Sequence, residues 1–453
     1  MNPLQHKNTS LSGPAARQRA SVLIVVMWVV FGLVSVTLYF AHSMTFELRA
    51  SDNRVAGLEA EQAIEGARRY LSCVLSNLNQ PGTMPDPQSY QCQAVAVGNA
   101  KFWLIGRTNV DNLTPTIPAF GLIDEASKLN INSSFVGTNL ALLPRMTLEL
   151  SYNIMAWRST NTANNNGGAE SDTYQRLQPP YLCKNAPFES VGELRLIYDL
   201  DMDTLYGEDA NLNGILDSNE NDGDASAPTD NMDGRLDPGL LEYVTAYSRE
   251  PANQTNGQAR VDITNRAGVT SLRTNLVTLF GTTRADQIIA KALATPTITS
   301  PLHFYLASGM TAAEFVQIEG IIRGTNVVGL VNVNTASSAV LACLPGMDVN
   351  SATQLAAYRQ SNQSSTNNLG TMSWLTQVLD PQVCQQMGPW ITGKSYQFMA
   401  DVAAVGHNGL GFRRTRFVFD TSQGTPIILY REDLSHLGWA LGKQVRDQLL
   451  RAK

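Results

Sequence analysis

The sequence predicts an α+β fold in which a long N-terminal helix joins an antiparallel sheet, and a large, mainly helical domain is inserted into that sheet. Three observations predict this arrangement. Apolar residues at helical spacing run without a proline from Pro14 to Pro81. Strand-like segments occur before residue 124 and again after residue 395. Helical patterns and polar loops lie between them, which implies that this middle part is an insertion.

The N-terminal helix begins with an apolar run that is long enough to cross a membrane. Residues 20–46 contain no charged side chain, and residues 22–41 match the roughly 20 residues that span a bilayer. Lys7, Arg17 and Arg19 precede the run, which predicts a cytoplasmic N-terminus and an exported remainder. The run is too long for a signal-peptide core and lacks a small-x-small cleavage site. We therefore expect a single membrane span.

Beyond Phe46 the same helix continues with an amphipathic pattern. Its apolar residues recur at helical spacing, at Val55, Leu58, Ala63, Ile64, Ala67, Leu71, Val74, Leu75 and Leu78. One helix over residues 21–79 would be roughly 90 Å long, at 1.5 Å per residue. The sequence thus predicts a membrane helix that runs directly into a helix with one apolar face.

This continuous helix resembles the N-terminus of type IV pilins and type II secretion pseudopilins. The resemblance implies that a prepilin peptidase removes residues 1–20 as a leader, cutting between Ala20 and Ser21, and that the new N-terminus is methylated. The family usually has Gly where this chain has Ala20, and most pilins have Glu where it has Val25. The K-class minor pseudopilin (general secretion pathway protein K) typically lacks that Glu, which narrows the resemblance. A plain single-span anchor is the alternative.

The rest of the chain divides into a sheet domain and an insert. Residues 101–107 and 118–123 have strand patterns, and residues 396–405, 411–420 and 425–431 predict an antiparallel meander. A final helix is indicated by apolar residues at spacings of three and four, namely Leu434, Leu437, Leu441, Val445 and Leu449. We expect residues 21–80 to form the long helix, residues 81–123 and 395–453 a pilin-like α/β domain, and residues 124–394 the insert. This arrangement is similar to that of the K-class pseudopilin.

An internal repeat occurs within the insert. An Asn-x-Asn segment opens each copy, at residues 130–132 and 332–334, and a fainter third opening lies at residues 261–265. The prolines and arginines that follow, at 144 and 345 and at 158 and 359, are each 201 residues apart. Each copy resembles a helix-hairpin-helix motif. Asp348 stands where DNA-binding versions have a phosphate-contacting glycine, so we expect structural packing and no nucleic acid.

Composition adds two constraints. With 453 residues and 43% hydrophobic residues, the chain is long enough for two or more globular domains. Residues 199–237 carry twelve Asp or Glu and one Arg, so the net charge of −6 belongs to one segment.

An exported location permits disulfides among the five cysteines. We predict a bridge between Cys343 and Cys384, which flank one helical module; Cys73 with Cys92 is a weaker pair.

The acidic segment contains a calcium-binding pattern. Residues 209–220 fit the twelve-residue EF-hand loop, with Gly214 at the sharp turn. Side-chain oxygens at positions one, three, five, nine and twelve, with a carbonyl at position seven, would bind calcium. These ligands are Asp209, Asn211, Asn213, Ile215, Asp217 and Glu220. A solvated acidic loop is the alternative, and the family resemblance also implies calcium in the insert.

A second, incomplete loop follows. Asn231, Asp233 and Asp237 keep positions three, five and nine, whereas Thr229 and Leu240 occupy positions one and twelve. Five other acidic residues could complete the site, and the sequence does not decide among Asp199, Asp201, Asp203, Asp222 and Asp224. A second calcium ion is therefore an open expectation.

The resemblance implies a structural role without catalysis. A K-class minor pseudopilin would lie at the tip of the pseudopilus, bound to other minor pseudopilins in a tip complex. It would be anchored by one span in the inner membrane, with most of the chain in the periplasm. The sequence shows no P-loop or nucleophile elbow, and its five histidines lack metal-ligand spacing. A minor pilin of a type IV pilus and a membrane-anchored DNA-uptake protein are the alternatives.

We expect processing between Ala20 and Ser21, because the basic leader and the apolar run direct the cut to the cytoplasmic side. Coexpression with a prepilin peptidase should yield a chain that starts at Ser21, as measured by N-terminal sequencing or intact mass. An ordinary signal peptidase would leave an N-terminus beyond about residue 40. That outcome would contradict the pilin-like interpretation.

Overall fold

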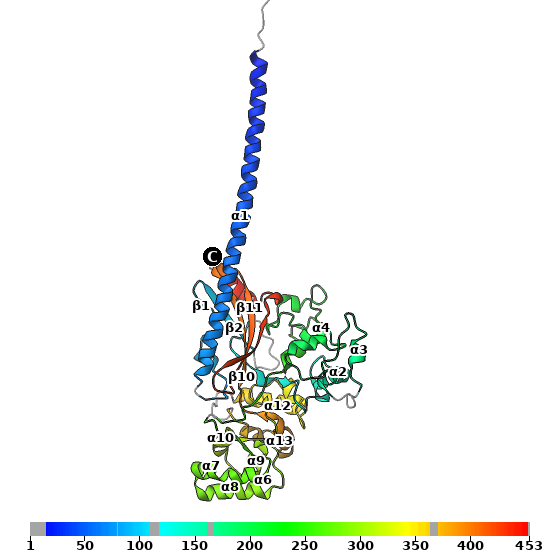
Figure 1. Cartoon of the computed structure of the whole chain (residues 1–453), viewed down its shortest axis with the longest axis vertical. Coiled ribbons are helices and arrows are strands. Elements are labelled where there is room, and N and C mark those ends of the chain that lie inside the picture. The colour runs from blue at the N-terminus through cyan, green and yellow to red at the C-terminus, as the bar shows by residue number, and fades with distance from the viewer. Residues whose placement is uncertain are drawn as a thin grey trace, which may run out of the picture.

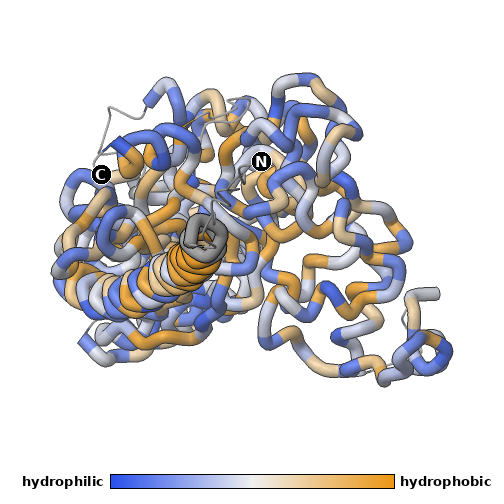
Figure 2. The backbone as a smooth tube through the Cα atoms, turned by 90° about the horizontal axis from the view of Figure 1, so that it is seen from above, coloured by the Kyte–Doolittle hydropathy of each residue, from blue (hydrophilic) through white to orange (hydrophobic). Residues whose placement is uncertain are grey.

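The computed structural model describes residues 15–78, 80–107, 117–160, 167–254, 256–362 and 370–451, without the side chains of residues 15–21. The predicted long helix is confirmed: α1 runs unbroken from Ala15 to Ser76, which is 62 residues or about 93 Å. It projects from the rest of the molecule (Figure 1). Its apolar N-terminal part is long enough to cross a membrane and is exposed. Seen along α1, hydrophobic residues of this part stand out in orange (Figure 2).

An antiparallel sheet forms the centre of the molecule. Its strand order is β1-β2-β10-β11-β12, and β3 pairs with the same edge of β10 as β2 does. The strands span Val95–Val97 (β1), Ala100–Ile105 (β2), Ile123–Asp124 (β3), Gln397–Val405 (β10), Arg413–Asp420 (β11) and Ile427–Asp433 (β12). The last three are the predicted meander. The first three strands lie within residues 95–124 and the last three within residues 397–433. Because the strands on either side of the insert belong to one sheet, the predicted insertion into the sheet is confirmed.

The two ends of the insert are neighbours in the sheet. Asp124 at the end of β3 is paired with Phe398 near the start of β10, in antiparallel register. The insert can therefore leave and rejoin the sheet without disturbing its hydrogen bonds. Figure 1 shows that the insert covers one side of the sheet and the end farthest from the N-terminus of α1.

Helix α1 packs on one face of the sheet through small residues. Alanines 60, 63 and 67 are fully buried, which lets the helix backbone approach phenylalanines 102, 398, 417 and 419 closely. The turn between β10 and β11 touches the helix backbone itself. A Cβ on Gly411, whose φ is +67°, would lie 2.3 Å from the nitrogen of Gly57. Glycine is required there for both conformation and space.

A histidine also ties this turn to α1. The ring nitrogens of His407 lie 2.7 Å from Glu59 and 3.0 Å from Asp52, both on α1. Hydrogen bonds to these two carboxylates raise the pKa of His407 above its usual value. His407 is therefore a structural contact between this turn and α1.

The opposite face of the sheet carries a second, smaller core. Trp103, Ile105, Ala403 and Val405 pack there against residues 440–445. The C-terminal helix α14, Gly442–Arg451, belongs to this core. It begins later than the predicted helix, because Gly438 has a φ of +83° and interrupts the helical backbone.

The predicted strand over residues 118–123 is largely absent. Only Phe120 forms a bridge, to Ile105, before β3 begins at Ile123. Pro118 has no amide hydrogen to donate, and Gly121 has a φ of +153°, so regular pairing cannot extend through this segment. The amide of Leu122 donates instead to the hydroxyl of Tyr90, at 2.8 Å.

The insert consists of three modules, each closed by a two-residue parallel strand pair. An opening strand and a closing strand join in each: β4 (Leu129–Asn130) with β5 (Val244–Thr245), β6 (Val261–Asp262) with β7 (Ile322–Arg323), and β8 (Val331–Asn332) with β9 (Ile391–Thr392). The opening and closing strands of each module therefore lie side by side and run in the same direction. The closing strands lacked any sequence signal because two residues have no periodicity.

The three openings predicted from the repeat share one hydrogen-bond pattern. Oδ1 of Asn130, Asp262 and Asn332 each accepts the backbone N–H two residues later, at 2.9 to 3.0 Å. The repeated arginines match as well. Arg158 donates to the carbonyl of Ile131, and Arg359 to that of Val333. The fainter third opening is thus confirmed by its hydrogen bond.

Helices fill the space between these strand pairs, and most are short. The first module contains α2 (Leu148–Arg158), α3 (Ser171–Tyr174), α4 (Met202–Tyr206) and α5 (Leu240–Tyr243). The second contains α6 (Arg266–Ser271), α7 (Arg273–Phe280), α8 (Thr282–Ala294), α9 (Pro301–Ser308) and α10 (Ala312–Glu319). The third contains α11 (Ser338–Ala342), α12 (Val349–Ser361) and α13 (Pro381–Met387). One hydrophobic core extends through all three modules.

The predicted bridge between Cys343 and Cys384 is wrong in this structure, where both are free, buried thiols. Each sulfur points to a backbone carbonyl of its own module, that of Ala339 and that of Leu379 respectively. Burial raises the pKa of Cys343 to about 12 and that of Cys384 to about 11. The position of the two cysteines on either side of one module does not determine where their side chains point. Cys73 and Cys92 are also free.

The tight contact at Gly411 generates a stability prediction. Gly411→Ala should lower the free energy of unfolding by about 1–3 kcal/mol more than Gly424→Ala, because its methyl group would overlap the α1 backbone. Gly424 is the matched control: its φ is +87°, but a Cβ there meets nothing within 4 Å. Urea unfolding of the full chain in detergent measures both. Equal losses would show that α1 does not pack closely on this turn.

Candidate metal centre at the domain junction

The predicted first calcium loop has the backbone that its sequence pattern requires. Gly214 has a φ of +72°, and its amide donates to Asp209 Oδ2 at 2.8 Å. Oδ1 of Asn211 accepts the amide of Asn213, and Oδ1 of Asn213 accepts that of Ile215, at 3.0 and 2.9 Å. These bonds wind the loop so that its polar side chains face one point.

The side chains predicted as ligands converge at that point. The amide nitrogens of Asn211 and Asn213 lie 2.8 and 3.0 Å from Asp217 Oδ2. Glu220 reaches back to the amides of Ala210 and Asp217, at 3.2 and 2.9 Å. An asparagine side chain can turn either its oxygen or its nitrogen inward. The set can therefore supply oxygens to a central cation.

Electrostatics at this point favour a cation. Asp209, Asn213 and Glu220 are each about 1% exposed. Burial, followed by the negative charges of Asp209 and Asp217, raises the pKa of Glu220 to about 8. Burial also raises the pKa of Asp209, although the nearby Arg107 opposes the shift. Carboxylates that are buried together without enough positive charge are the environment that a bound cation stabilises.

The second loop repeats this backbone. Gly234 has a φ of +74°, matching Gly214. Oδ1 of Asn231 accepts the amide of Asp233, and Oδ1 of Asp233 accepts that of Arg235, at 2.9 and 2.8 Å. Nδ2 of Asn231 lies 3.3 Å from Asp237 Oδ2, as the corresponding pair does in the first loop. The predicted fragment is thus folded as an EF-hand-like loop.

Two residues outside the second loop complete it. Asn221 Oδ1 accepts the amide of Gly234 at 3.1 Å, the role that Asp209 has for Gly214. Glu208 Oε2 accepts the amide of Asp237 at 3.0 Å, as Glu220 does for Asp217. Glu208 is about 1% exposed, and burial raises its pKa. Asn221 and Glu208 thus stand in place of positions one and twelve.

Neither Glu208 nor Asn221 is among the five acidic residues predicted to complete the second loop. Of those five, Asp201 caps α4 by accepting the amide of Thr204, and Asp222 accepts from the hydroxyl of Ser226. One signal was present: Glu208 directly precedes Asp209, and Asn221 directly follows Glu220. The two sites are therefore interleaved in sequence. Within the described residues, no three His, Cys, Asp or Glu side chains form a metal site alone, so both sets depend on asparagine and carbonyl oxygens.

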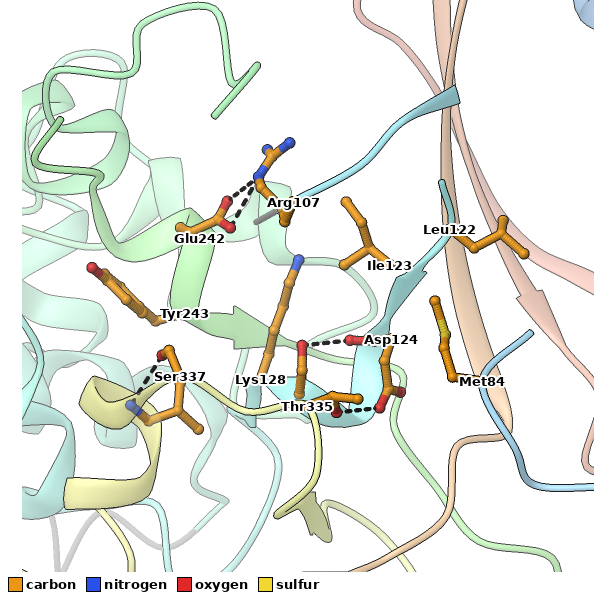
Figure 3. A pocket seen from close by; sticks show the side chains of 12 residues that line it. Met84, Arg107, Leu122, Ile123, Asp124, Lys128, Glu242, Tyr243, Thr335 and Ser337 are labelled. Atoms are coloured by element: carbon orange, nitrogen blue, oxygen red, sulfur yellow. Dashed lines mark hydrogen bonds and ion pairs between the residues drawn. The ribbon is translucent and has the colours of Figure 1, made fainter. Parts of the chain in front are cut away.

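A cavity of about 120 Å³ lies near the loops, between the sheet and the insert (Figure 3). Its polar groups already have partners. Arg107 pairs with Glu242 at 2.9 Å, and Asp124 accepts from the hydroxyls of Thr335 and Ser395, each at 2.6 Å. Burial raises the pKa of Asp124 despite these hydrogen bonds. The residues that line the cavity therefore connect the sheet domain to the insert through an ion pair and hydrogen bonds.

The remaining predicted residues lie elsewhere. Ala20 and Ser21 are within α1, and the structure does not describe their side chains. In the repeat hairpins, Asp348 caps α12 by accepting the amide of Ser351 at 2.7 Å. A carboxylate therefore occupies the helix end where a phosphate would bind. Arg145 has a φ of +61° at the position matching Gly346, and it pairs with Glu208 at 3.6 Å.

Comparison with known proteins gives a family and one solved structure. No curated protein matches the sequence at a significant level. A crystal structure of the GspK-GspI-GspJ complex from the enterotoxigenic Escherichia coli type 2 secretion system is similar over 86% of this chain and 98% of that chain. The identity of 10% and the TM-score of 0.39 are too low to define a common arrangement of domains.

The family match falls on the first module. Residues 106–206 match the family described as type II secretion system (T2SS), protein K. This segment runs from the end of β2 through α4 and stops just before the first calcium loop. Together with the long N-terminal helix and the interrupted sheet, the match confirms the resemblance to the K-class minor pseudopilins of the type II secretion system that the sequence indicates.

Proposed function

We propose that the chain is a K-class minor pseudopilin of the type II secretion system and that it occupies the tip of the pseudopilus. The position of the insert is the observation that carries the proposal. The insert lies at the end of the sheet domain that is farthest from the N-terminus of α1 (Figure 1). In a filament of parallel N-terminal helices, a subunit added above would need that space. The insert therefore allows subunits below it and excludes one above.

The N-terminal segment supports the same position. Val25 replaces the Glu that in pilins pairs with the N-terminal amine of a neighbouring subunit during assembly. A subunit with nothing above it receives no such amine. The exposed apolar side chains of α1, from Val22 to Phe40, would anchor the chain in the inner membrane and pack against other minor pseudopilins. The sheet domain and the insert would then lie in the periplasm.

The tip position predicts where the insert appears on assembled pseudopili. Gold particles directed against the insert should label one end of each filament in electron micrographs. A variant in which a short turn replaces residues 126–395 tests the cause, because Asp124 and Phe398 are already paired. Combined with Val25→Glu, this variant should be incorporated along the filament. Labelling of the unmodified chain along the filament length would contradict the proposal.

We also propose that the insert binds two calcium ions, one in each loop. Each site offers three carboxylates and two amide side chains, and calcium prefers such hard oxygen ligands. Asp209, Asp217 and Glu220 would hold the first ion, and Asp233, Asp237 and Glu208 the second. Calcium would supply positive charge to buried carboxylates. Because the end ligands of the two sites are adjacent in the chain, each ion would also help to order the other loop.

Single substitutions separate the two sites. Calorimetric titration of the full chain in detergent should show two calcium ions for the unmodified chain. Glu220→Gln should lose the first site and Glu208→Gln the second, because each removes a carboxylate but keeps the side-chain shape. At a hundredfold excess over Kd, each ion should add about 2.7 kcal/mol to the free energy of unfolding.

Asp199→Asn is the matched control for these variants. Asp199 belongs to the same acidic segment but is exposed, and asparagine tolerates its φ of +63°. It should bind calcium as the unmodified chain does. If Glu208→Gln retained both ions, the completion of the second site by Glu208 would be wrong. If the unmodified chain bound none, both sites would be acidic loops only.

A further inference from the structure

We propose that the first calcium loop fastens the insert to the sheet, so that calcium binding and domain docking strengthen each other. This inference rests on the calcium site proposed above. It concerns what the loop touches on its outer side, where residues of the sheet domain contact it. These contacts come from three segments that are far apart in the sequence.

Arg414 on β11 holds the loop by its backbone. Its side chain is fully buried and forms two hydrogen bonds with Asp401 on β10, at 2.7 and 2.6 Å. Its remaining N–H groups donate to the carbonyl oxygens of Asn211 and of Leu212, the latter at 2.7 Å. One sheet residue thus connects loop positions three and four to the central strand.

Arg107, which follows β2, makes the second attachment. Nη2 donates to the carbonyl of Leu212 at 3.0 Å, while Nε pairs with Glu242 at 2.9 Å. The Cδ atom of Arg107 lies only 2.9 Å from where a Cβ on Gly214 would be. The glycine that the calcium loop needs for its turn therefore also makes room for this arginine.

The C-terminal segment makes the third attachment. Asn211 Nδ2 lies 3.3 Å from the carbonyl of Trp439. Cδ1 of Ile215 lies 3.0 Å from where a Cβ on Gly442 would be, at the start of α14. The loop is therefore held from β2, from β11 and from the segment that leads into α14.

The two arginine contacts do not compete with calcium. The arginines bind carbonyls of positions three and four, whereas an EF-hand ion uses the carbonyl of position seven and side-chain oxygens. Arg414 and Arg107 are each neutralised by their own carboxylate, Asp401 and Glu242. The ion and the sheet thus require the same loop conformation through different atoms. Two interactions that favour one conformation are coupled, and the coupling is reciprocal.

The test is the calcium affinity of the full chain in detergent, measured by isothermal titration calorimetry. Arg414→Gln keeps every proposed ligand but removes the donors to Asn211 and Leu212. Its affinity at the first site should fall by about 5- to 150-fold, the usual range for coupled sites. Arg249→Gln is the matched control, because Arg249 pairs with Asp420 across the same domain boundary. No hydrogen bond or ion pair of Arg249 in the described structure involves the loop, so its affinity should not change.

A second measurement follows the docking itself. Amide hydrogen exchange of residues 437–442, which belong to the sheet domain, should be faster in chelator than in calcium. Arg414→Lys replaces Arg414→Gln if the latter does not fold. Lysine keeps the charge but lacks the planar fork with which Arg414 makes two hydrogen bonds to Asp401 and two to the loop carbonyls, so the same loss is expected.

The outcomes distinguish this inference from the calcium proposal. Unchanged affinity in the Arg414 variants, or an equal loss in Arg249→Gln, would overturn the coupling and leave the calcium sites in place. Unchanged exchange at residues 437–442 would also overturn it. An unmodified chain that binds no calcium would remove both proposals.

Discussion

Strand β10 is the element on which the other parts of the structure depend, and all nine of its residues are buried. It pairs with β2 and β3 along one edge and with β11 along the other. Its Phe398 and Val402 face α1, while Asp401 and Ala403 face the opposite side. Helix α1, the ends of the insert and the first EF-hand-like loop are therefore all positioned against one strand.

The two faces of this strand use different forces. On the α1 face, burial of apolar surface drives packing, and alanines let the helix approach closely. On the other face, Asp401 lies in an arginine cluster; although burial opposes ionisation, Arg414 and Arg416 lower its pKa. A buried ion pair adds little net stability, but it is highly sensitive to the loss of one partner. Such a pair thus favours one specific arrangement of the insert on the sheet.

The insert is built from three modules in which the last strand pairs with the first. Each module returns to its own start through a parallel strand pair, and the first module carries the two EF-hand-like loops between α4 and its closing strand. Because Glu208 and Asn221 flank the first loop but serve the second, the two loops fold as one unit. This arrangement places the first loop directly against Arg107 and Arg414 of the sheet domain.

The sequence by itself determined the features whose signal is local: α1, the β10–β12 meander, the Asn-x-Asn openings and the EF-hand-like turn of the first loop. Periodicity, turn residues and fixed spacing within short segments carry these signals. Tertiary structure alone decided the closing strands, the roles of Glu208 and Asn221, the free thiols of Cys343 and Cys384, and the attachment of the loop by Arg414. Each depends on which distant residues become neighbours and where their side chains point, and neither spacing nor composition encodes this information.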